Sequence, residues 1–339
     1  MNVWAGAERY IDRTADVERL RAHGIQLLAV RHWRATGRSV PLDLIADERF
    51  SAIVALSAPS LLGRIRCLLD GPLVVLKGPE VAARYPDPAL RGYGDLDILV
   101  PDPAGAQAVL VDAGFELVDD YAFPHHDQPL HWPGSPLLVE LHRFPSWLRW
   151  MTPPSTAELF AMAVPSATGI DGVSTLPARE HALFVAAHSW RHAPLRRLID
   201  LIDVALMAEG VDPYELDALA RQWGMGRVWA TTTHAIADLF SCGDAPVRSR
   251  AVRFGGRHLT TVRDRTVLEK HLAMWLGALW APTPSQIPRM LVATIADDVR
   301  PLLGEPWTSK LGRIGRACRD AFSPWSIRDR AGTDRRTLS

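Results

Sequence analysis

The chain lacks most of the features that mark specialised classes of protein. It has only three cysteines in 339 residues, Cys67, Cys242 and Cys318, and none stands in a CxxC pair. This excludes a disulfide scaffold and a cysteine zinc site, and it suits a reducing cytoplasm. Charge of either sign is not in excess, because 38 basic residues balance 38 acidic ones. We therefore do not expect binding to nucleic acid through a general attraction for phosphates.

A secretory signal and long apolar runs are also missing. Residues 1–9 lack the basic patch and apolar run of a signal peptide. The longest apolar stretch late in the chain, 271–282, is much shorter than the ~20 residues of a membrane span. With 47% apolar and 22% charged residues, the composition is that of a folded globular protein. We expect a cytoplasmic protein without membrane contact, and the length predicts about two domains.

Hydrophobic periodicity predicts helical regions around a small mixed unit. The pattern before residue 70 is helical, the next stretch predicts strand, helix, strand, helix and hairpin, and the strand signal fades after Pro145. The strongest helical block is 180–209. In chain order, the predicted regions are an N-terminal helical segment (1–70), a mixed core (71–145), a helical domain (146–240), a C-terminal helical region (241–326) and a flexible tail (327–339).

The most informative stretch, residues 91–100, reads Arg-Gly-Tyr-Gly-Asp-Leu-Asp-Ile-Leu-Val. Acidic and apolar residues alternate, so on a strand Asp95 and Asp97 share one face while Leu96 and Ile98 turn into the core. Two adjacent carboxylates repel each other unless a cation lies between them, and oxygen ligands suit Mg²⁺ or Mn²⁺. The other interpretation is a solvent-facing edge strand with two ordinary aspartates.

A third carboxylate follows on a second predicted strand, residues 137–143. Its alternation places Glu140 and His142 on one face. If this strand adjoins the first, Glu140 joins Asp95 and Asp97 in a three-carboxylate cup. Such a cup can hold two metal ions for in-line phosphoryl or nucleotidyl transfer.

Groups that can meet phosphate lie upstream of the aspartates. Lys77 and Gly78 end a short apolar strand and open a helix, where backbone amides and a cation can meet an anion. Lys77 is one of only three lysines in the chain. Arg91 is a second candidate for the phosphates, and surface ion pairing is the other interpretation of both residues.

Histidines gather in two places. His126 and His142 lie near the predicted hairpin and are candidates to orient an acceptor or to bind zinc. His188 and His192 fall four residues apart on a helix and, with Asp200, form a candidate polar wall of the cleft. A buried network that joins helix to core is an equal interpretation of that wall.

In their order along the chain, these blocks resemble the uncharacterised nucleotidyltransferase family of the DNA polymerase β-like superfamily, over about residues 40–240. The blocks that carry the resemblance are Leu76-Lys77-Gly78, Tyr85, Arg91, Gly94-Asp95-Leu96-Asp97-Ile98-Leu99-Val100, Val139-Glu140-Leu141-His142, and the pattern of His188, His192 and Asp200. Two positions depart from the pattern. Gly78-Pro79 stands where the superfamily usually has Gly-Ser, so no serine hydroxyl contacts the phosphate. Arg143 stands where the family often has an aromatic residue, which bears on the acceptor side.

The resemblance implies an α+β fold, with a small mixed-sheet polymerase β-like nucleotidyltransferase core at 71–145 wrapped by N- and C-terminal helices. It implies catalytic metal ligands at Asp95, Asp97 and Glu140. The nucleotide-binding residues that it implies are Lys77, Gly78, Arg91 and Gly94, and the candidates for the acceptor side are His126, His142, His188, His192 and Asp200.

The expected activity is transfer of a nucleoside monophosphate from an NTP, such as ATP, to a hydroxyl or phosphate of an acceptor. Mg²⁺ or Mn²⁺ is the expected cofactor and pyrophosphate the second product. Neutral charge and an aromatic-rich helical region favour a small-molecule or peptide acceptor over a long nucleic acid, with natural-product tailoring as one role. Transfer of another phosphate-bearing group stays open, because a metal cup recognises phosphates and not what they carry.

Two alternatives remain from the sequence. The first is a toxin-like enzyme that modifies the end of a tRNA, and it predicts an arginine-lined groove at the mouth of the cleft. The second is a non-catalytic relic that serves as an antitoxin or a nucleotide sensor. The complete acidic set of Asp95, Asp97 and Glu140 disfavours the relic.

Overall fold

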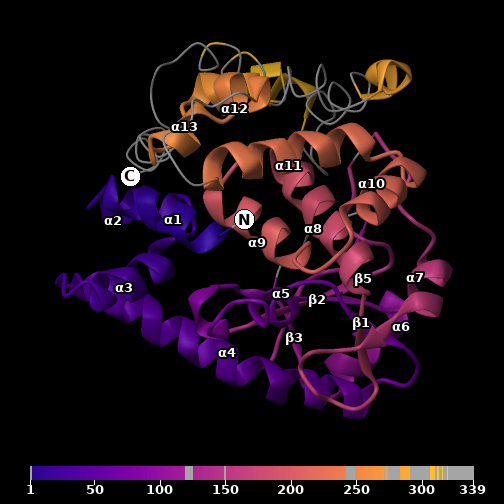
Figure 1. Ribbon diagram of the computed structural model, residues 1–339. Helices are drawn as coiled ribbons and strands as arrows, with labels where there is room; N and C mark the ends of the chain where they lie inside the picture. Colours follow the sequence, from indigo (N-terminus) through magenta and orange to yellow (C-terminus); the bar gives the residue numbers. More distant parts are fainter. Residues whose placement is uncertain are drawn as a thin grey trace.

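The computed structural model describes residues 2–118, 125–148, 150–241 and 249–270, together with short segments between 272 and 319. The predicted tail and most of the predicted C-terminal helical region lie outside the described residues. In Figure 1 the sheet lies between the long helix α4 (Leu42–Leu68), below it, and the helices α8 to α11, above it. The fold is the expected mixture of helices with one small mixed sheet.

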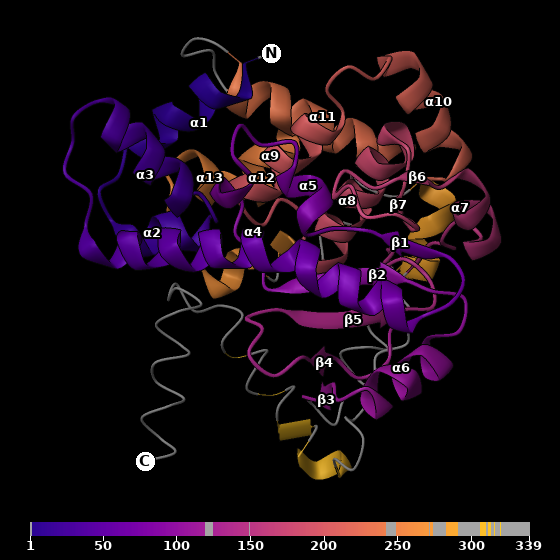
Figure 2. The same cartoon turned by 90° about the horizontal axis from the view of Figure 1, so that it is seen from below.

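One mixed sheet of seven strands forms the centre of the described structure, in the order β3-β4-β5-β2-β1-β7-β6. The strands are β1 (Leu73–Val75), β2 (Asp95–Leu99), β3 (Glu116–Leu117), β4 (Leu130–His131), β5 (Leu138–His142), β6 (Val164–Pro165) and β7 (Val173–Thr175). Strand β2 pairs antiparallel with β1 and parallel with β5. Figure 2 follows the sheet from β1 through β2 and β5 to β4 and β3.

The predicted elements of the core are present. Strands β4 and β5 pair antiparallel across the expected hairpin. Helix α6 (Pro103–Asp112) begins after Asp102, whose side chain accepts a hydrogen bond from the Gly105 amide, as a helix cap does. The sequence pattern predicts no further strands after Pro145. This prediction is wrong, because β6 and β7 extend the sheet and β7 pairs parallel with β1. Both are too short to show a period, so their pairing, and not their pattern, makes them strands.

Helices α4 and α6 cover one face of the sheet. From α4, Val54, Leu62 and Ile65 are buried against the apolar residues of β2 and β5. Of the described helices, α4 is long and apolar enough to cross a membrane. Of that apolar stretch 33% is buried, on the side that packs against the sheet. Helix α4 also runs on through Pro59 as one helix, within the region before residue 70 that the sequence pattern predicts to be helical.

The opposite face of the sheet meets the second group of helices and a large apolar cluster. The helices of this second group are α5 (Pro79–Ala82), α8 (Ala178–His192), α9 (Leu198–Met207) and α11 (Gly226–Phe240). The remaining helices are α1 (Val3–Asp12), α2 (Val17–Ala22), α3 (Gln26–Ala35), α7 (Thr156–Met162), α10 (Pro213–Gln222), α12 (Arg250–Gly255) and α13 (Arg257–Thr260), with short 3₁₀ turns at Pro88–Leu90 and Pro284–Gln286. The predicted block 180–209 is split at Pro194 into α8 and α9, because proline cannot continue the hydrogen bonding of α8.

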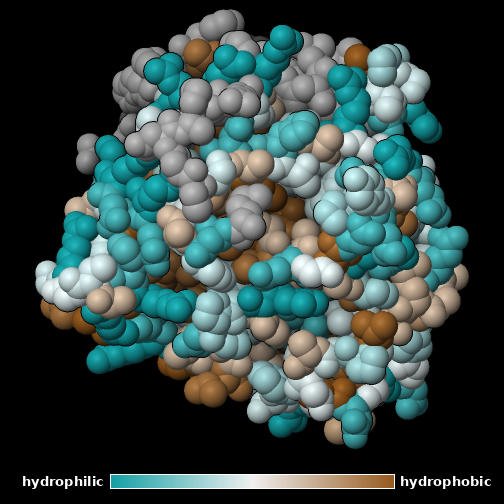
Figure 3. Space-filling view, viewed as in Figure 1, coloured by the Kyte–Doolittle hydropathy of each residue, from teal (hydrophilic) through white to brown (hydrophobic). Residues whose placement is uncertain are grey.

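A groove of about 670 Å³ lies where the start of α1 meets α9 and α11. Val3, Trp4 and Trp229 are among its lining residues. Figure 3, drawn in the view of Figure 1, shows a hollow with hydrophobic side chains near the centre of the molecule. The lining includes none of the residues that the sequence singles out for function.

Candidate active site

The register of two parallel strands brings the acidic residues together. Asp97 on β2 is the direct Cα partner of Glu140 on β5, and Leu99 is the partner of His142. Leu96, Ile98, Val139 and Leu141 lie in the cluster under α4, so the polar residues occupy the opposite face, as their alternation predicts. The predicted neighbourhood of the two strands is therefore correct.

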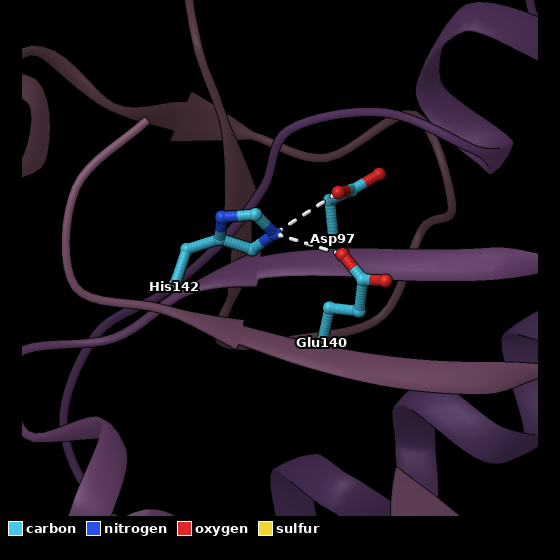
Figure 4. Close-up of side chains that lie close together, drawn as sticks. All are labelled: Asp97, Glu140 and His142. Carbon is cyan, nitrogen blue, oxygen red and sulfur yellow. Dashed lines mark hydrogen bonds and ion pairs between the residues drawn. The ribbon is translucent and has the colours of Figure 1, made fainter. Parts of the chain in front are cut away.

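Asp97, Glu140 and His142 form a compact group, here called the metal-ligand group (Figure 4). One donor atom from each lies within 4.8 Å of the other two. His142 Nε2 lies 3.0 Å from Asp97 Oδ1 and 3.6 Å from Glu140 Oε2. Asp97 and His142 are buried and Glu140 is partly exposed. The second oxygen of Asp97, Oδ2, is buried without a hydrogen-bond partner. A divalent cation fits this donor set, since it would satisfy that oxygen.

Neighbouring charges and hydrogen bonds favour the ionised forms of Asp97 and His142. Burial would raise the pKa of Asp97, but the Lys77 ammonium and the hydrogen bond from His142 hold it well below its ordinary value. Burial would lower the pKa of His142, but its hydrogen bonds to Asp97 and Glu140 raise it to about 9. Without a metal, the buried pair is an imidazolium against a carboxylate. A cation at this place would replace the proton of His142.

Asp95, the other aspartate of the motif, lies outside the metal-ligand group. It is opposite Leu138 in the register and lines a cavity. Burial, and then the negative charge of Asp97, raise the pKa of Asp95. A second positive charge beside Asp95 would relieve this repulsion. The structure thus joins Asp97 and Glu140 through His142 and holds Asp95 next to them on the cavity side.

A chain of close contacts runs from the carboxylates to helix α8. Lys77 Nζ lies 3.8 Å from Asp97 Oδ2 and donates a hydrogen bond of 2.9 Å to His188 Nε2. Burial, and then the charge of Lys77, hold the pKa of His188 well below its ordinary value, so His188 is the neutral acceptor that Lys77 requires. His192 Nε2 lies 3.0 Å from His188 Nε2. Lys77 is therefore fixed by the two predicted groups, the aspartate strand and the histidine helix.

Two predicted glycines have different roles. Gly78 precedes α5 with φ +63° and ψ −114°, a conformation that L side chains rarely adopt. An added Cβ would also lie 3.1 Å from the carbonyl oxygen of Asp95. Gly94 lines the cavity, and its carbonyl accepts a hydrogen bond from the Leu138 amide, but a Cβ there would meet nothing within 4 Å. Only Gly78 is required by the backbone.

Arg91 is bound chiefly by protein. Its guanidinium donates to both carboxylate oxygens of Asp203 at 3.0 to 3.1 Å, and the Tyr85 hydroxyl donates to the same carboxylate at 2.6 Å. All three form a buried link between the 85–91 segment and helix α9. The Nη1 atom of Arg91 has no hydrogen-bond partner, and Arg91 lines the cavity. This nitrogen is the part of Arg91 that could meet a phosphate.

The cavity, here called the polar cavity, has a volume of about 620 Å³. The predicted residues that line it are Lys77, Arg91, Gly94, Asp95, His188, His192 and Asp200. The metal-ligand group itself is not among its lining residues but adjoins it through Lys77 and Asp95. Sequence reasoning missed the contribution of the N-terminal helices, which supply Arg21, Asp47 and Ser51. These lie on surface-like patterns in the sequence, and no local signal marks them.

Two further predicted residues take other positions. His126 is buried beside the metal-ligand group, with its Nε2 3.5 Å from Glu140 Oε2. Asp200 lines the polar cavity and accepts hydrogen bonds from Arg197, the shortest at 2.6 Å. Asp200 is therefore an ion-pair partner within the wall of the cavity.

The family resemblance is confirmed by comparison with known families. Residues 12–241 match the family model described as "Uncharacterised nucleotidyltransferase". A search of curated proteins gave no match. A search of solved structures gave none either.

Proposed function

The chain belongs to the uncharacterised nucleotidyltransferase family, and on that premise we propose that it transfers a nucleoside monophosphate from an NTP to a small-molecule or peptide acceptor. The acceptor oxygen attacks the α-phosphorus, and a hydroxyl acceptor releases its proton to solvent. The bond from the α-phosphorus to the bridging oxygen breaks, and pyrophosphate leaves with the bonding electrons. ATP is the first nucleotide to test. The cytoplasm, where the exposed thiol of Cys67 would stay reduced, is the proposed compartment.

The observation that carries the proposal is the pairing of Asp97 with Glu140 beside Lys77. It sets two carboxylates, an imidazole and an ammonium at one edge of the polar cavity. Nucleotidyl transfer uses groups of these kinds, because negative charge builds on the phosphoryl oxygens during the reaction and must be neutralised. The sheet does not need these acidic side chains for its packing, since apolar side chains fill its other face.

The proposed cofactor is a divalent cation, Mn²⁺ or Mg²⁺, held by Asp97, Glu140 and His142. When bound, such an ion polarises phosphoryl oxygens and lowers the pKa of an attacking oxygen. Asp95 faces the polar cavity, where it would help to hold the metal-bound triphosphate. Lys77, fixed by His188, would bind the phosphate that leaves.

A small acceptor is favoured over a nucleic acid by the pairing of the arginines. Four arginines line the polar cavity, as the tRNA alternative predicts. Arg21 pairs with Asp47, Arg91 with Asp203 and Arg197 with Asp200. Arg196 alone has no such partner among the residues that line the cavity. With three of its four arginines paired to acids, the cavity leaves little free positive charge for a long nucleic acid. A small acceptor is therefore the first candidate and tRNA the second.

Metal-dependent binding and turnover test the proposal. The full chain is titrated with each NTP by calorimetry, with Mn²⁺, with Mg²⁺ and with EDTA. It is then incubated with α-³²P-labelled NTP and extracts fractionated by size. We expect metal-dependent NTP binding and transfer of label to material of low molecular mass. Absence of metal-dependent NTP binding would contradict the proposal, and label on tRNA would select the second candidate.

A further inference from the structure

A second recess lies beside the polar cavity and carries mostly basic side chains. It has a volume of about 480 Å³ and lies between the ends of α2 and α8 and the segment after α13. We call it the basic recess, and its basic lining residues are His23, Arg196, His258, Arg263, Arg265 and Lys270. The residues that make up the metal-ligand group do not line it.

Pairing within the protein leaves a surplus of positive charge there. Arg263 is neutralised by Glu269, whose two oxygens lie 2.5 and 2.7 Å from its guanidinium nitrogens. Asp264 is the one acidic residue of the described lining. Among the described residues, no hydrogen bond or ion pair is found for the guanidinium of Arg196 or the ammonium of Lys270. Arg265, nine-tenths buried, adds a third cation.

Arg265 provides the recess with a buried hydrogen-bond donor that is not used within the protein. One of its amino groups, Nη2, donates to the carbonyls of Pro194 and Leu195 at 2.7 and 2.6 Å, which fixes the chain between α8 and α9. Its Nε is buried without a hydrogen-bond partner. A buried donor without a partner is costly and calls for a ligand that would satisfy it.

The backbone is strained on both sides of the recess. The described non-glycine residues with positive φ are Leu195, at +50°, and Val262, at +44°. Each directly precedes an arginine of the recess, Arg196 and Arg263. A β-branched residue such as valine rarely adopts this conformation, and such strain persists where the surroundings hold it.

The basic recess and the polar cavity share a wall. His192 and Arg196 line both. From His192 the contacts lead through His188 to Lys77 and on to Asp97, over steps of 3.0, 2.9 and 3.8 Å. A molecule that fills the recess therefore has its neighbouring atoms beside the groups proposed to handle the nucleotide.

We propose that the basic recess binds a phosphate group of the acceptor, through Arg196, Arg265 and Lys270. The assignment to the acceptor rests on the proposed function, since the triphosphate is expected at Lys77 and Gly78 on the other side of the shared wall. A phosphate suits the recess because it can accept hydrogen bonds from several cations at once. The acceptor class is then a phosphorylated small molecule or a phosphorylated peptide.

Inorganic phosphate is the probe, titrated into the full chain by calorimetry without metal or nucleotide. We expect binding that weakens with added NaCl. Lys270→Gln should weaken it roughly tenfold, and Arg196→Gln combined with Lys270→Gln roughly a hundredfold. Arg257→Gln, an exposed charge on α13 outside the recess, is the matched control and should leave it unchanged. Phosphate affinity that Lys270→Gln does not change overturns the recess as a phosphate site.

The source of the phosphate is decided by repeating the titration with saturating ATP and Mn²⁺. Unchanged affinity supports the acceptor, whereas competition by ATP assigns the recess to the nucleotide and overturns the acceptor assignment. Asp97→Asn separates the two proposals, because it should abolish nucleotide transfer and leave phosphate binding intact. A wild-type chain that binds phosphate through Lys270 but no metal-bound NTP would refute the proposed function and not the phosphate site.

Discussion

Asp97 and Glu140 face each other as Cα partners on adjacent parallel strands, although 42 residues separate them in the sequence. The pairing places the imidazole of His142 against both carboxylates. Buried charges so close together are stable only as a paired set. Changes at either carboxylate should therefore alter ligand binding and local charge balance together.

Asp97→Asn keeps the shape of the side chain and removes its charge. We expect loss of metal-dependent NTP binding and a fall in transfer rate of about 100-fold or more, since a bound metal contributes several kcal/mol to such reactions. Calorimetry with Mn²⁺ and NTP and an assay with labelled nucleotide measure both effects. Asp112→Asn, an exposed acid on α6, is the control. Full activity of Asp97→Asn would remove Asp97 from the metal site.

The metal preference tests His142 as a ligand. An imidazole beside two carboxylates favours Mn²⁺ over Mg²⁺, because nitrogen ligands suit transition metals better than magnesium. We expect half-maximal activity at a lower concentration of Mn²⁺ than of Mg²⁺. His142→Asn, which offers an oxygen, should shift the preference toward Mg²⁺. Equal response of both proteins to the two metals would show that His142 does not bind the ion.

Gly78 and Gly94 offer a matched pair of substitutions. Gly78→Ala forces a side chain into a positive φ and against the Asp95 carbonyl, so it should lower the free energy of unfolding by about 1 to 3 kcal/mol. Gly94→Ala meets open space and should cost less than about 1 kcal/mol. Urea unfolding compares the two. Equal stability would contradict the backbone requirement at Gly78.

The buried link between Arg91 and Asp203 should govern stability. Arg91→Met leaves the Asp203 carboxylate buried without its cation, at a cost of roughly 3 to 5 kcal/mol. A second change, Asp203→Leu, should recover much of that loss. Thermal and urea unfolding of the single and double variants measure the coupling. Purely additive losses would mean that the two charges do not interact.

His181 should make stability depend on pH. Its Nε2 donates to the Leu76 carbonyl at 2.7 Å, and burial lowers its pKa to about 4. Above pH 6.5 the residue is neutral in both states. As pH falls from 6.5 to 4, the unfolded chain gains a proton that the folded one does not, so the free energy of unfolding falls by about 3 kcal/mol.

His181→Gln isolates that contribution from those of the other buried histidines. Its amide can still donate to Leu76, but it does not titrate. Urea unfolding at pH 7.5 and pH 4.5 should show a smaller loss for the variant than for the wild type. The same loss in both proteins would mean that His181 takes up a proton while folded.

The strand faces of the site could be predicted because they depend on a local pattern. Within each strand, alternation separates the polar side from the apolar side, Asp97 from Leu96 and Glu140 from Val139, before any pairing is known. Family resemblance then supplies the order of the blocks. Lys77 is predicted from its position after an apolar strand, and the structure places it 3.8 Å from Asp97.

The rest depends on packing between distant segments. Ser51 lies within the long helix α4, and its hydroxyl donates to the Ala89 carbonyl, a contact that no pattern in either segment announces. The family pattern marks His142 but does not say where its side chain lies. Its closeness to Asp97 follows from the register of β2 and β5. Asp95 shares the strand face of Asp97, yet the helices around it make it a wall of the cavity.

Strand β1 is flanked by β2 on one edge and by β7 on the other, and its partner in β7 arrives only at residues 173–175. A fragment that stops at residue 145 would expose the amides and carbonyls along that edge to any other chain in solution. Excised in this way, the unit would tend to associate with itself. The smallest piece that can stand alone therefore extends at least to Thr175, and expression trials that cut earlier should yield aggregates.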